Sequence, residues 1–392
     1  MIFDKLFQLM AEKNASDIFV SAGAPISIKI HGNTIPINQQ VMDPVTIQKM
    51  AYEMLTQDQI HAFEVKRELN LSIGIASVGN FRINMFWQRN TIAIVVRFIT
   101  SDIPKIDGLA LPPILSDFIM EKRGLVLVVG ATGSGKSTTI AAMLDHRNAS
   151  RSGHILTVED PIEFLFKHKR SLVNQREVGL DTQSWAEALK NAMRQAPDCI
   201  LIGEIRDKET MSAAIAYAQT GHLCLATLHA NNAYHALNRI INFFPLENRT
   251  SLFLDLSATL KTIISQRLVR KPDGKLTPTV EILLNTRHIA ELIEKGELNG
   301  IKEAMEQSLA PGSQTFEQDL YRMYKEGIIT LDEALANADS ATNMSWLINN
   351  QQIHAPAEKN IKVPFVTATG AADPDQTSSG ASFSEFTLNM DN

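Results

Sequence analysis

A glycine-rich segment, Gly130–Ser137, carries the most specific chemical pattern in this sequence of 392 residues. It reads Gly-Ala-Thr-Gly-Ser-Gly-Lys-Ser, which fits the phosphate-binding pattern G-x4-G-K-[ST] in full. Glycines let the backbone wrap around phosphates, so that N–H groups and the start of the next helix face the anion. We expect Lys136 to reach the β- and γ-phosphates of ATP and the Ser137 hydroxyl to bind Mg²⁺. The nucleotide-binding residues that we predict are Gly130, Ala131, Thr132, Gly133, Ser134, Gly135, Lys136, Ser137 and Thr138, the last of which opens the helix.

Acidic residues follow two later apolar segments. Glu159 and Glu163 come directly after the second predicted strand, where a parallel sheet presents its ligands. Glu204 ends the third segment, and Gly203 stands where related motifs commonly carry aspartate. One carboxylate must orient or deprotonate the attacking water. Spacing alone leaves Glu159, Glu163 and Glu204 open for that role, and it leaves Glu204 open as a ligand that holds Mg²⁺ through water.

Two histidines, His222 and His229, flank the fourth apolar segment. Seven positions along an extended strand span roughly 23 Å, so a straight strand keeps the two imidazoles from binding one metal ion. We expect these histidines either to sense the γ-phosphate or to contact a neighbouring subunit.

The elements that must position these groups alternate in type. Apolar runs typical of strands buried on both faces recur at Gly124–Gly130, His154–Val158, Cys199–Gly203 and Leu223–Thr227. Helical patterns separate them at 138–145, 184–194, 208–218 and 234–241. This alternation predicts a doubly wound α/β domain over 113–285. Residues 286–347 are expected to be mostly helical, and the composition of 348–392 predicts a disordered tail.

The first hundred residues have a different pattern. Residues 2–13 have helical spacing, and 44–66 are mainly helical. Strands are expected at Asp17–Val20, Ile26–His31, Leu69–Ala76, Asn80–Trp87 and Thr91–Phe98. We therefore predict a small α+β domain over 1–100, joined to the rest by a linker over 101–112 that contains Pro104 and Gly108.

Composition narrows the class of protein. The formal net charge of -6 disfavours nucleic acid as a partner, since nucleic-acid binding needs many exposed Lys and Arg. The two cysteines, Cys199 and Cys224, lie in apolar runs and are expected to be core residues.

No run reaches the roughly 18 apolar residues of a membrane helix, and the N-terminus lacks a signal-peptide pattern. We expect a cytoplasmic protein that meets the membrane only through partners.

Four motifs occur in one order: the P-loop, the acidic segment 159–163, Gly203–Asp207, and 220–229 with its two histidines. This set resembles the secretion and pilus ATPase superfamily, and it is most similar to the PilT/PilU retraction branch. The resemblance implies a PAS-like N-terminal domain, a RecA-like core and a homo-hexamer with ATP between subunits. It also implies Glu163 as the water-activating carboxylate and Glu204 as a support for Mg²⁺. The catalytic set that we predict is Glu163, Glu204, Lys136, Arg82, Arg97, Arg194, His222 and His229, with Arg89 as a further candidate.

One segment departs from the family pattern. Retraction motors carry Ala-Ile-Arg-Asn-Leu-Ile-Arg after the core, whereas His288–Glu294 lacks both arginines. This departure and the added tail resemble the PilU branch. The resemblance implies an accessory to a PilT-like retraction ATPase, acting on an inner-membrane platform protein at the cytoplasmic face of the inner membrane. An alternative is a scaffold or coupling protein with secondary ATPase activity. The last residues, with Phe383, Phe386 and Leu388, are expected to be a solvated end of the tail, and a short docking peptide is the alternative.

Two further classes of P-loop protein fit this sequence less well. Extension-type and type II secretion ATPases usually carry a four-cysteine zinc insertion and a longer N-terminal region, and both are missing here. A DNA-acting recombinase of RecA type is disfavoured by the acidic charge balance.

Overall fold

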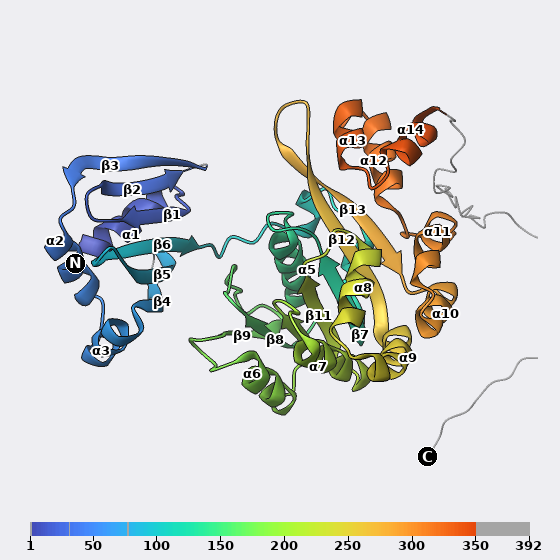
Figure 1. Ribbon diagram of the computed structural model, residues 1–392, viewed down its shortest axis with the longest axis horizontal. Coiled ribbons are helices and arrows are strands. Elements are labelled where there is room, and N and C mark those ends of the chain that lie inside the picture. Colours follow the sequence, from blue (N-terminus) through green and yellow to red (C-terminus); the bar gives the residue numbers. More distant parts are fainter. Residues whose placement is uncertain (1, 31, 77, 350–392) are drawn as a thin grey trace, which may run out of the picture. The chain divides into compact units, whose positions relative to one another are not determined.

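The computed structural model describes residues 2–30, 32–76 and 78–349 (Figure 1). The tail expected over 348–392 and the docking peptide with Phe383, Phe386 and Leu388 therefore lie almost entirely outside the described residues. Within the described part, the chain forms two β-sheets with helices around them, followed by a helical C-terminal region.

The N-terminal sheet has six strands in the order β3-β2-β1-β6-β5-β4, and every neighbouring pair is antiparallel. Its strands are β1 (Asp17–Val20), β2 (Pro25–Ile30), β3 (Asn33–Val41), β4 (Glu68–Ile75), β5 (Gly79–Gln88) and β6 (Thr91–Ile99). Its helices are α1 (Ile2–Glu12), α2 (Pro44–Tyr52) and α3 (Gln57–Lys66). The helix α1 packs its apolar stripe on this sheet, where the rings of Phe7 and Phe81 stack with centroids 4.4 Å apart. The five expected strands and the helical segments are confirmed, whereas β3 was not expected.

The segment 101–112, which was expected to be a linker, contains a short helical turn, and some of its side chains are buried. A 3₁₀ turn, η1 (Ile106–Gly108), is followed by α4 (Ile114–Met120). Ile106 and Leu115 are buried in the same cluster as residues of β7 (Gly124–Val129) and α5 (Lys136–Ser150) in the second domain. Thr100 forms an isolated bridge with Phe164, which lies in the loop after β8 (Gly153–Glu159), so the residue before this segment is hydrogen-bonded to the second domain.

The core sheet has seven strands in the order β13-β12-β7-β11-β10-β8-β9. All neighbours are parallel except β12 and β13, which form an antiparallel hairpin. The strands are β7 (Gly124–Val129), β8 (Gly153–Glu159), β9 (Ser171–Glu177), β10 (Cys199–Ile202), β11 (Leu223–Leu228), β12 (Leu260–Arg270) and β13 (Leu276–Leu284). The four predicted strands are confirmed as the centre of the sheet, and β9, β12 and β13 extend it on both sides.

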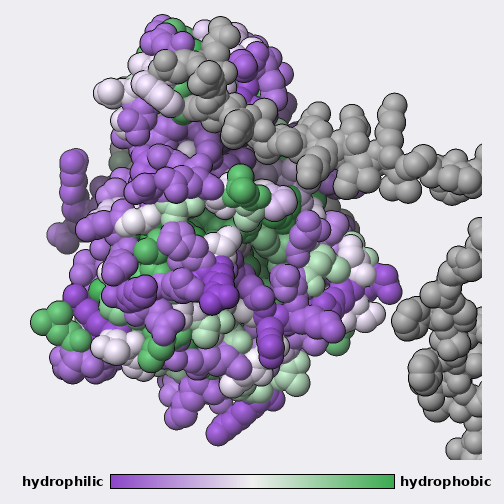
Figure 2. Space-filling model, turned by 90° about the vertical axis from the view of Figure 1, so that its right-hand side faces the viewer, coloured by the Kyte–Doolittle hydropathy of each residue, from purple (hydrophilic) through white to green (hydrophobic). Residues whose placement is uncertain are grey.

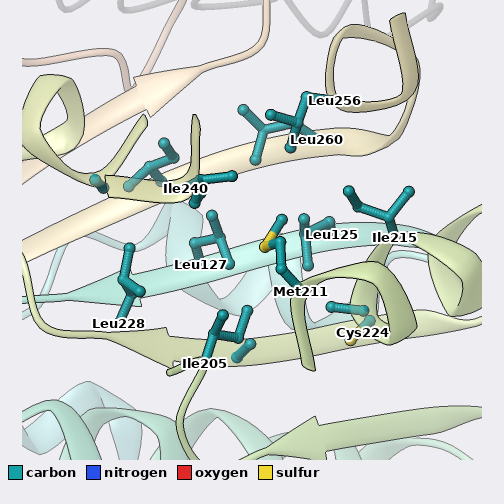
Figure 3. Packing of buried hydrophobic residues seen from close by; sticks show 14 of the residues in the cluster. Leu125, Leu127, Ile205, Met211, Ile215, Cys224, Leu228, Ile240, Leu256 and Leu260 are labelled. Carbon is teal, nitrogen blue, oxygen red and sulfur yellow. The ribbon is translucent and has the colours of Figure 1, made fainter. Parts of the chain in front are cut away.

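Helices cover both faces of this sheet, as the doubly wound prediction requires. The helices of the core are α5 (Lys136–Ser150), α6 (Trp185–Ala192), α7 (Lys208–Gln219), α8 (Ala233–Asn242) and α9 (Arg249–Thr259), with 3₁₀ turns η2 (Met193–Gln195) and η3 (Leu246–Asn248). Leu125 and Leu127 of β7 face Met211 of α7 and Ile240 of α8 (Figure 3). Their alternate neighbours Val126 and Val128 pack with α4 and α5 on the opposite face. Cys199 and Cys224 are buried free thiols, as expected.

The C-terminal region is helical, as predicted. It contains α10 (Arg287–Lys295), η4 (Leu298–Gly300), α11 (Ile301–Glu306), α12 (Phe316–Lys325), α13 (Leu331–Asn337) and α14 (Ala341–Asn349). Helices α12 to α14 share a small apolar cluster that includes Phe316, Leu320 and Met344, and Val269 of β12 completes it. The divergent segment His288–Glu294 lies within α10 and buries Ile289 and Ile293.

Most of the surface on one side of the molecule is hydrophilic, and hydrophobic residues gather around a hollow near the middle of that face (Figure 2). Some large apolar side chains are strongly exposed, among them Leu246 and Leu309. Among the described helices, none is both long enough and apolar enough to cross a membrane.

Candidate nucleotide and hydrolysis site

The P-loop connects the carboxyl end of β7 to the first turn of α5. Gly135 is the residue before this helix and has φ 89°, a left-handed conformation that costs glycine little. A Cβ atom at Gly135 would also lie 2.7 Å from Nε2 of Gln266. The segment therefore needs glycine at this position both for its backbone conformation and for the close approach of β12.

Lys136 lies at the beginning of α5, where the backbone N–H groups of a helix favour an anion. Its Nζ donates to the carbonyl oxygens of Gly130 and Ala131, at 2.8 Å in each case. Burial lowers the pKa of Lys136, and the charges of Glu204 and Glu163 oppose that shift. A buried lysine in the first turn of α5, with its ammonium group held by the P-loop carbonyls, suits the phosphates of a nucleotide.

The acidic segment after β8 is held by β9. Glu159 is 8% exposed, and its carboxylate accepts hydrogen bonds from Thr157 Oγ1 (2.6 Å) and Gln175 Nε2 (3.4 Å). Burial raises the pKa of Glu159 to about 7. Gln175 also donates to the carbonyl of Phe164 (2.8 Å), which fixes the loop that carries Glu163. Glu163 is exposed and faces the same pocket as Lys136.

The end of β10 approaches the end of β8 closely. A Cβ atom at Gly203 would lie 3.1 Å from Cα of Glu159 and 3.2 Å from the carbonyl oxygen of Val158. The missing aspartate at this position thus has a steric reason, since the two strand ends leave little room for a side chain. Glu204 follows, and its Oε2 accepts from Arg206 Nε at 2.7 Å.

The histidines lie at opposite ends of β11. Nε2 of His229 is 3.4 Å from Oε1 of Glu204, which places His229 in the pocket. His222 precedes the strand, and its Nδ1 lies 3.1 Å from Thr220 Oγ1 and 3.3 Å from the carbonyl oxygen of Tyr217. Within its own chain, His222 is therefore separated from the pocket by the length of β11. The contact of His222 with a neighbouring subunit stays a prediction.

The predicted groups that do converge form a polar cavity of about 270 Å³ at the carboxyl ends of the parallel strands. Lys136, Ser137, Glu163, Glu204 and His229 all line it. The other residues that line it are Thr132, Gly133, Ile140, Ala141, Glu159, Asp160, Pro161, Phe164, Phe166, Leu201, Gly203 and Thr227. A cation in the first turn of a helix, the Ser137 hydroxyl and several carboxylates around one cavity can bind a nucleoside triphosphate and activate water.

The predicted arginines do not line this cavity in the described chain. Arg82 and Arg97 are cross-strand neighbours on β5 and β6. Nε of Arg97 pairs with Asp17 at 2.9 Å, and Nη2 of Arg82 lies 3.7 Å from Glu177. Arg89 is exposed in the turn between β5 and β6.

Arg194 is exposed on η2, which leads into the amino end of β10, whereas the cavity lies at the carboxyl ends. None of these four arginines lies where it could contact a nucleotide in the cavity of its own chain.

Sequence reasoning missed several residues of the site. Gln175 and Gln266 lie on β9 and β12, two strands that were not expected. The side-chain oxygen of Gln266 accepts a hydrogen bond from Thr139 of α5 at 2.7 Å, so it supports the P-loop helix. Thr227 also lines the cavity, and its place at the end of a predicted strand was a signal for it.

Comparison with known proteins gives consistent results. The family model described as type II/IV secretion system protein matches residues 1–278. The chain is 48% identical to the type IV pilus ATPase PilU of Pseudomonas aeruginosa over 349 residues, which cover 89% of this chain and 91% of that protein. It is 37% identical to the type IV pilus retraction ATPase PilT of the same bacterium, covering 88% of this chain and 100% of PilT. Among solved structures, the pilus retraction motor PilT with bound ADP matches at TM-score 0.81 and 40% identity, over 87% of this chain and 98% of that chain.

Proposed function

The chain belongs to the type II/IV secretion system protein family and, within it, to the PilT/PilU pilus ATPases, and on that premise we propose that it hydrolyses ATP to power or assist type IV pilus retraction. Twitching motility is the cell behaviour that this activity serves. The observation that carries the proposal is the convergence of Lys136, Ser137, Glu163 and Glu204 on one cavity in an ATPase core.

The binding part of the mechanism uses the P-loop. Backbone N–H groups of residues 130–138 and the Lys136 ammonium hold the phosphates, and they balance the negative charge that builds on the transferred group. The hydroxyl of Ser137 and the carboxylate of Glu204 offer oxygen atoms of the kind that Mg²⁺ prefers, and they would hold this ion. When bound, Mg²⁺ supplies positive charge to the β- and γ-phosphate oxygens.

In the hydrolytic part of the mechanism, Glu163 is the residue that activates the attacking water. This carboxylate is exposed to the cavity, whereas an oxygen of Glu159 is already occupied by Thr157 and Gln175. Glu163 takes a proton from the attacking water, and Glu159 keeps the loop that carries Glu163 in place. His229, 3.4 Å from Glu204, orients that carboxylate and senses the γ-phosphate.

We further propose a homo-hexameric ring with ATP between subunits. Arg82, Arg97 and Arg194 lie away from the cavity of their own chain, which suits delivery to the site of a neighbour. Their positive charge would offset charge on the γ-phosphate in the transition state. His222, at the other end of β11, is proposed to contact a neighbouring subunit. The units of such a motor would be the domain over 1–100, the connection over 101–112, the core over 113–285, and the helical region over 286–347.

The PilU-like features favour an accessory role. We propose that the ring works beside a PilT-like retraction ATPase and engages an inner-membrane platform protein of the pilus at the cytoplasmic face. The support is the similarity to PilU together with the absence of both arginines from His288–Glu294.

The decisive experiment measures Mg²⁺-dependent ATP hydrolysis by the purified chain, alone and with a PilT-like ring, and sizes the oligomer in the same buffer. Lys136→Ala should abolish turnover, and Glu163→Gln should lower kcat by roughly 10²-fold or more while nucleotide binding persists. The exposed Lys122→Ala, two residues before β7, is the matched control and should hydrolyse ATP normally. Wild-type protein that hydrolyses no ATP under either condition would refute the proposal.

A further inference from the structure

The loop after β11, residues 229–232, touches the nucleotide cavity at one end and the C-terminal helical region at the other. At the cavity end, His229 contacts Glu204 across 3.4 Å. The carbonyl oxygen of His229 accepts from Arg239 Nη1 of α8 at 2.9 Å. The position of the imidazole therefore depends on how firmly this short loop is held.

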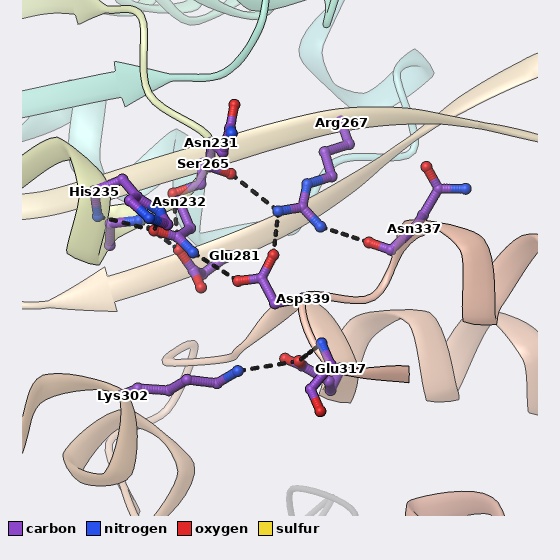
Figure 4. A network of polar contacts seen from close by, with 12 residues as sticks. Asn231, Asn232, His235, Ser265, Arg267, Glu281, Lys302, Glu317, Asn337 and Asp339 are labelled. Carbon is purple, nitrogen blue, oxygen red and sulfur yellow. Dashed lines mark hydrogen bonds and ion pairs between the residues drawn. The ribbon is translucent and has the colours of Figure 1, made fainter. Parts of the chain in front are cut away.

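Arg267 of β12 holds the far end of the loop (Figure 4). Its Nη2 donates to the carbonyl oxygen of Asn231 at 3.1 Å and also to Oδ1 of Asp339. Its Nη1 donates to the carbonyl oxygen of Asn337. The guanidinium carbon lies 3.9 Å from the centre of the Phe316 ring, so the side chain has a fixed orientation.

The two carboxylate oxygens of Asp339 accept hydrogen bonds from different residues, Arg267 and Asn232. Oδ1 accepts from Arg267, and Oδ2 accepts from Nδ2 of Asn232 at 2.7 Å. The amide oxygen of Asn232, Oδ1, accepts a hydrogen bond from the backbone N–H of His235 at 2.9 Å and thereby caps α8. One acidic side chain between α13 and α14 thus fixes both the end of the loop and the start of the next helix.

The segment around Asp339 is itself anchored to the helical region. The backbone N–H of Ser340 donates to Oε1 of Glu317 on α12 at 3.0 Å, and Lys302 Nζ lies 3.1 Å from the same oxygen. The residue before Arg267, Gln266, accepts from Thr139 of the P-loop helix on the other face of the sheet. Neighbouring positions of β12 therefore contact the P-loop helix and the C-terminal region.

From this arrangement we infer that Asp339 and Arg267 are positioning residues for the nucleotide site. They form a latch that ties residues 229–232 to the C-terminal helices and holds His229 against Glu204. The inference rests on the proposed ATPase function. It extends that function by giving the C-terminal region control over the catalytic step, and by coupling the state of the nucleotide to residues 337–340.

The test compares ATP turnover by the intact ring with and without Asp339→Asn, which keeps the shape of the side chain and removes its charge. We expect kcat to fall about ten-fold while KM for ATP stays within about two-fold, because the P-loop is unaltered and only His229 and Glu204 shift. Glu326→Gln is the control, since it removes an ion pair with Arg322 in the same helical region without touching the loop.

Hydrogen exchange supplies a second readout that does not depend on turnover. Asp339→Asn should speed amide exchange at residues 231–233, and a nucleotide bound to wild-type protein should slow exchange at 337–340. If exchange rises at 337–349 alone and kcat matches that of Glu326→Gln, the latch is overturned. If wild-type protein hydrolyses no ATP, the proposed function fails, and the exchange result still decides the latch.

Discussion

Two carboxyl groups in the core are buried deeply enough to titrate near neutral pH. Burial raises the pKa of Glu159 and that of Glu281 to about 7 in each case. Glu281 of β13 accepts hydrogen bonds from the Ala233 N–H (2.7 Å) and from Ser265 Oγ (2.9 Å). Asp339 raises and Arg267 lowers its pKa through their charges. Glu281 does not line the nucleotide cavity, so its titration can be followed through the free energy of unfolding.

Glu281 should make the unfolding free energy depend on pH. A folded pKa of about 7 above the ordinary 4.5 means that the unfolded chain ionises first, so stability falls as pH rises from about 4.5 to about 7. The full loss is on the order of 3 kcal/mol. Glu281→Gln mimics the protonated acid and should remove this part of the pH dependence.

Denaturant unfolding of wild-type and Glu281→Gln protein between about pH 5 and about pH 8 measures the effect. The variant should gain stability relative to wild type toward the alkaline end. The exposed Glu247→Gln should show no such gain. Parallel pH profiles for wild type and Glu281→Gln would contradict the assignment.

At the scale of single elements, the helix starts are specified by their own sequence. Asp207 caps α7: its Oδ1 accepts from the N–H of Thr210 at 2.8 Å, and the Thr210 hydroxyl accepts from the Asp207 N–H in return. The helix then buries Met211 and Ile215 against β7 and β11, as Figure 3 shows. The cap thus fixes where α7 begins directly after Glu204 and Arg206.

Asp207→Ala should lower the unfolding free energy by about 1 kcal/mol, because one N–H of the first turn loses its partner. Glu209→Ala removes a negative charge from the same turn but leaves the cap intact, and should cost only a few tenths of a kcal/mol. Urea unfolding with an unchanged m-value checks both variants. Equal losses for the two variants would show that helix charge, and not the cap, matters.

At the scale of the whole molecule, the separation of the arginines from their own cavity has a direct consequence. Arg97 is 66% exposed and pairs with Asp17, so it is available at the surface of the N-terminal domain. If a neighbour's Arg97 completes the site, subunits with different defects can complement each other. A Lys136→Ala subunit keeps its arginine, and an Arg97→Ala subunit keeps its P-loop.

Mixing purified Lys136→Ala and Arg97→Ala proteins under conditions of subunit exchange should therefore restore part of the ATPase activity that each lacks alone. Some interfaces in the mixed ring combine an intact P-loop with an intact arginine. Lys136→Ala mixed with itself controls for concentration effects. Activity that stays at the level of the separate variants would argue against an arginine supplied between subunits.

Much of the site could be predicted from the sequence because its chemistry is local. The P-loop needs eight consecutive residues, and Glu163 and Glu204 follow buried strands whose apolar runs are visible directly. Parallel strands bring their carboxyl ends to one edge, so the order of the motifs already predicted their meeting. The structure places Lys136, Ser137, Glu163, Glu204 and His229 around one cavity.

The missed strands lack a pattern of their own. Both faces of β3 are exposed, and β9 is largely polar. The strands β12 and β13 are buried on both faces over most of their length, so none of the four alternates as a half-buried strand does. Their identity comes from the strands with which they pair. The supports on them, Gln175 and Gln266, were missed for the same reason.

A P-loop ATPase could be predicted from the amino-acid sequence alone, because binding phosphate and activating water depend on short motifs with fixed spacing. The pilus family came from the resemblance of those motifs to the secretion and pilus ATPases, and the comparisons confirm it. The contacts that hold those motifs in place become visible only in the folded chain. Arg267 and Asp339 lie 72 positions apart, and Thr139 and Gln266 lie 127 apart. Contacts between residues so far apart in the sequence depend on the pairing of β12 with β7 and on the packing of the C-terminal helices. No local sequence pattern encodes either of these.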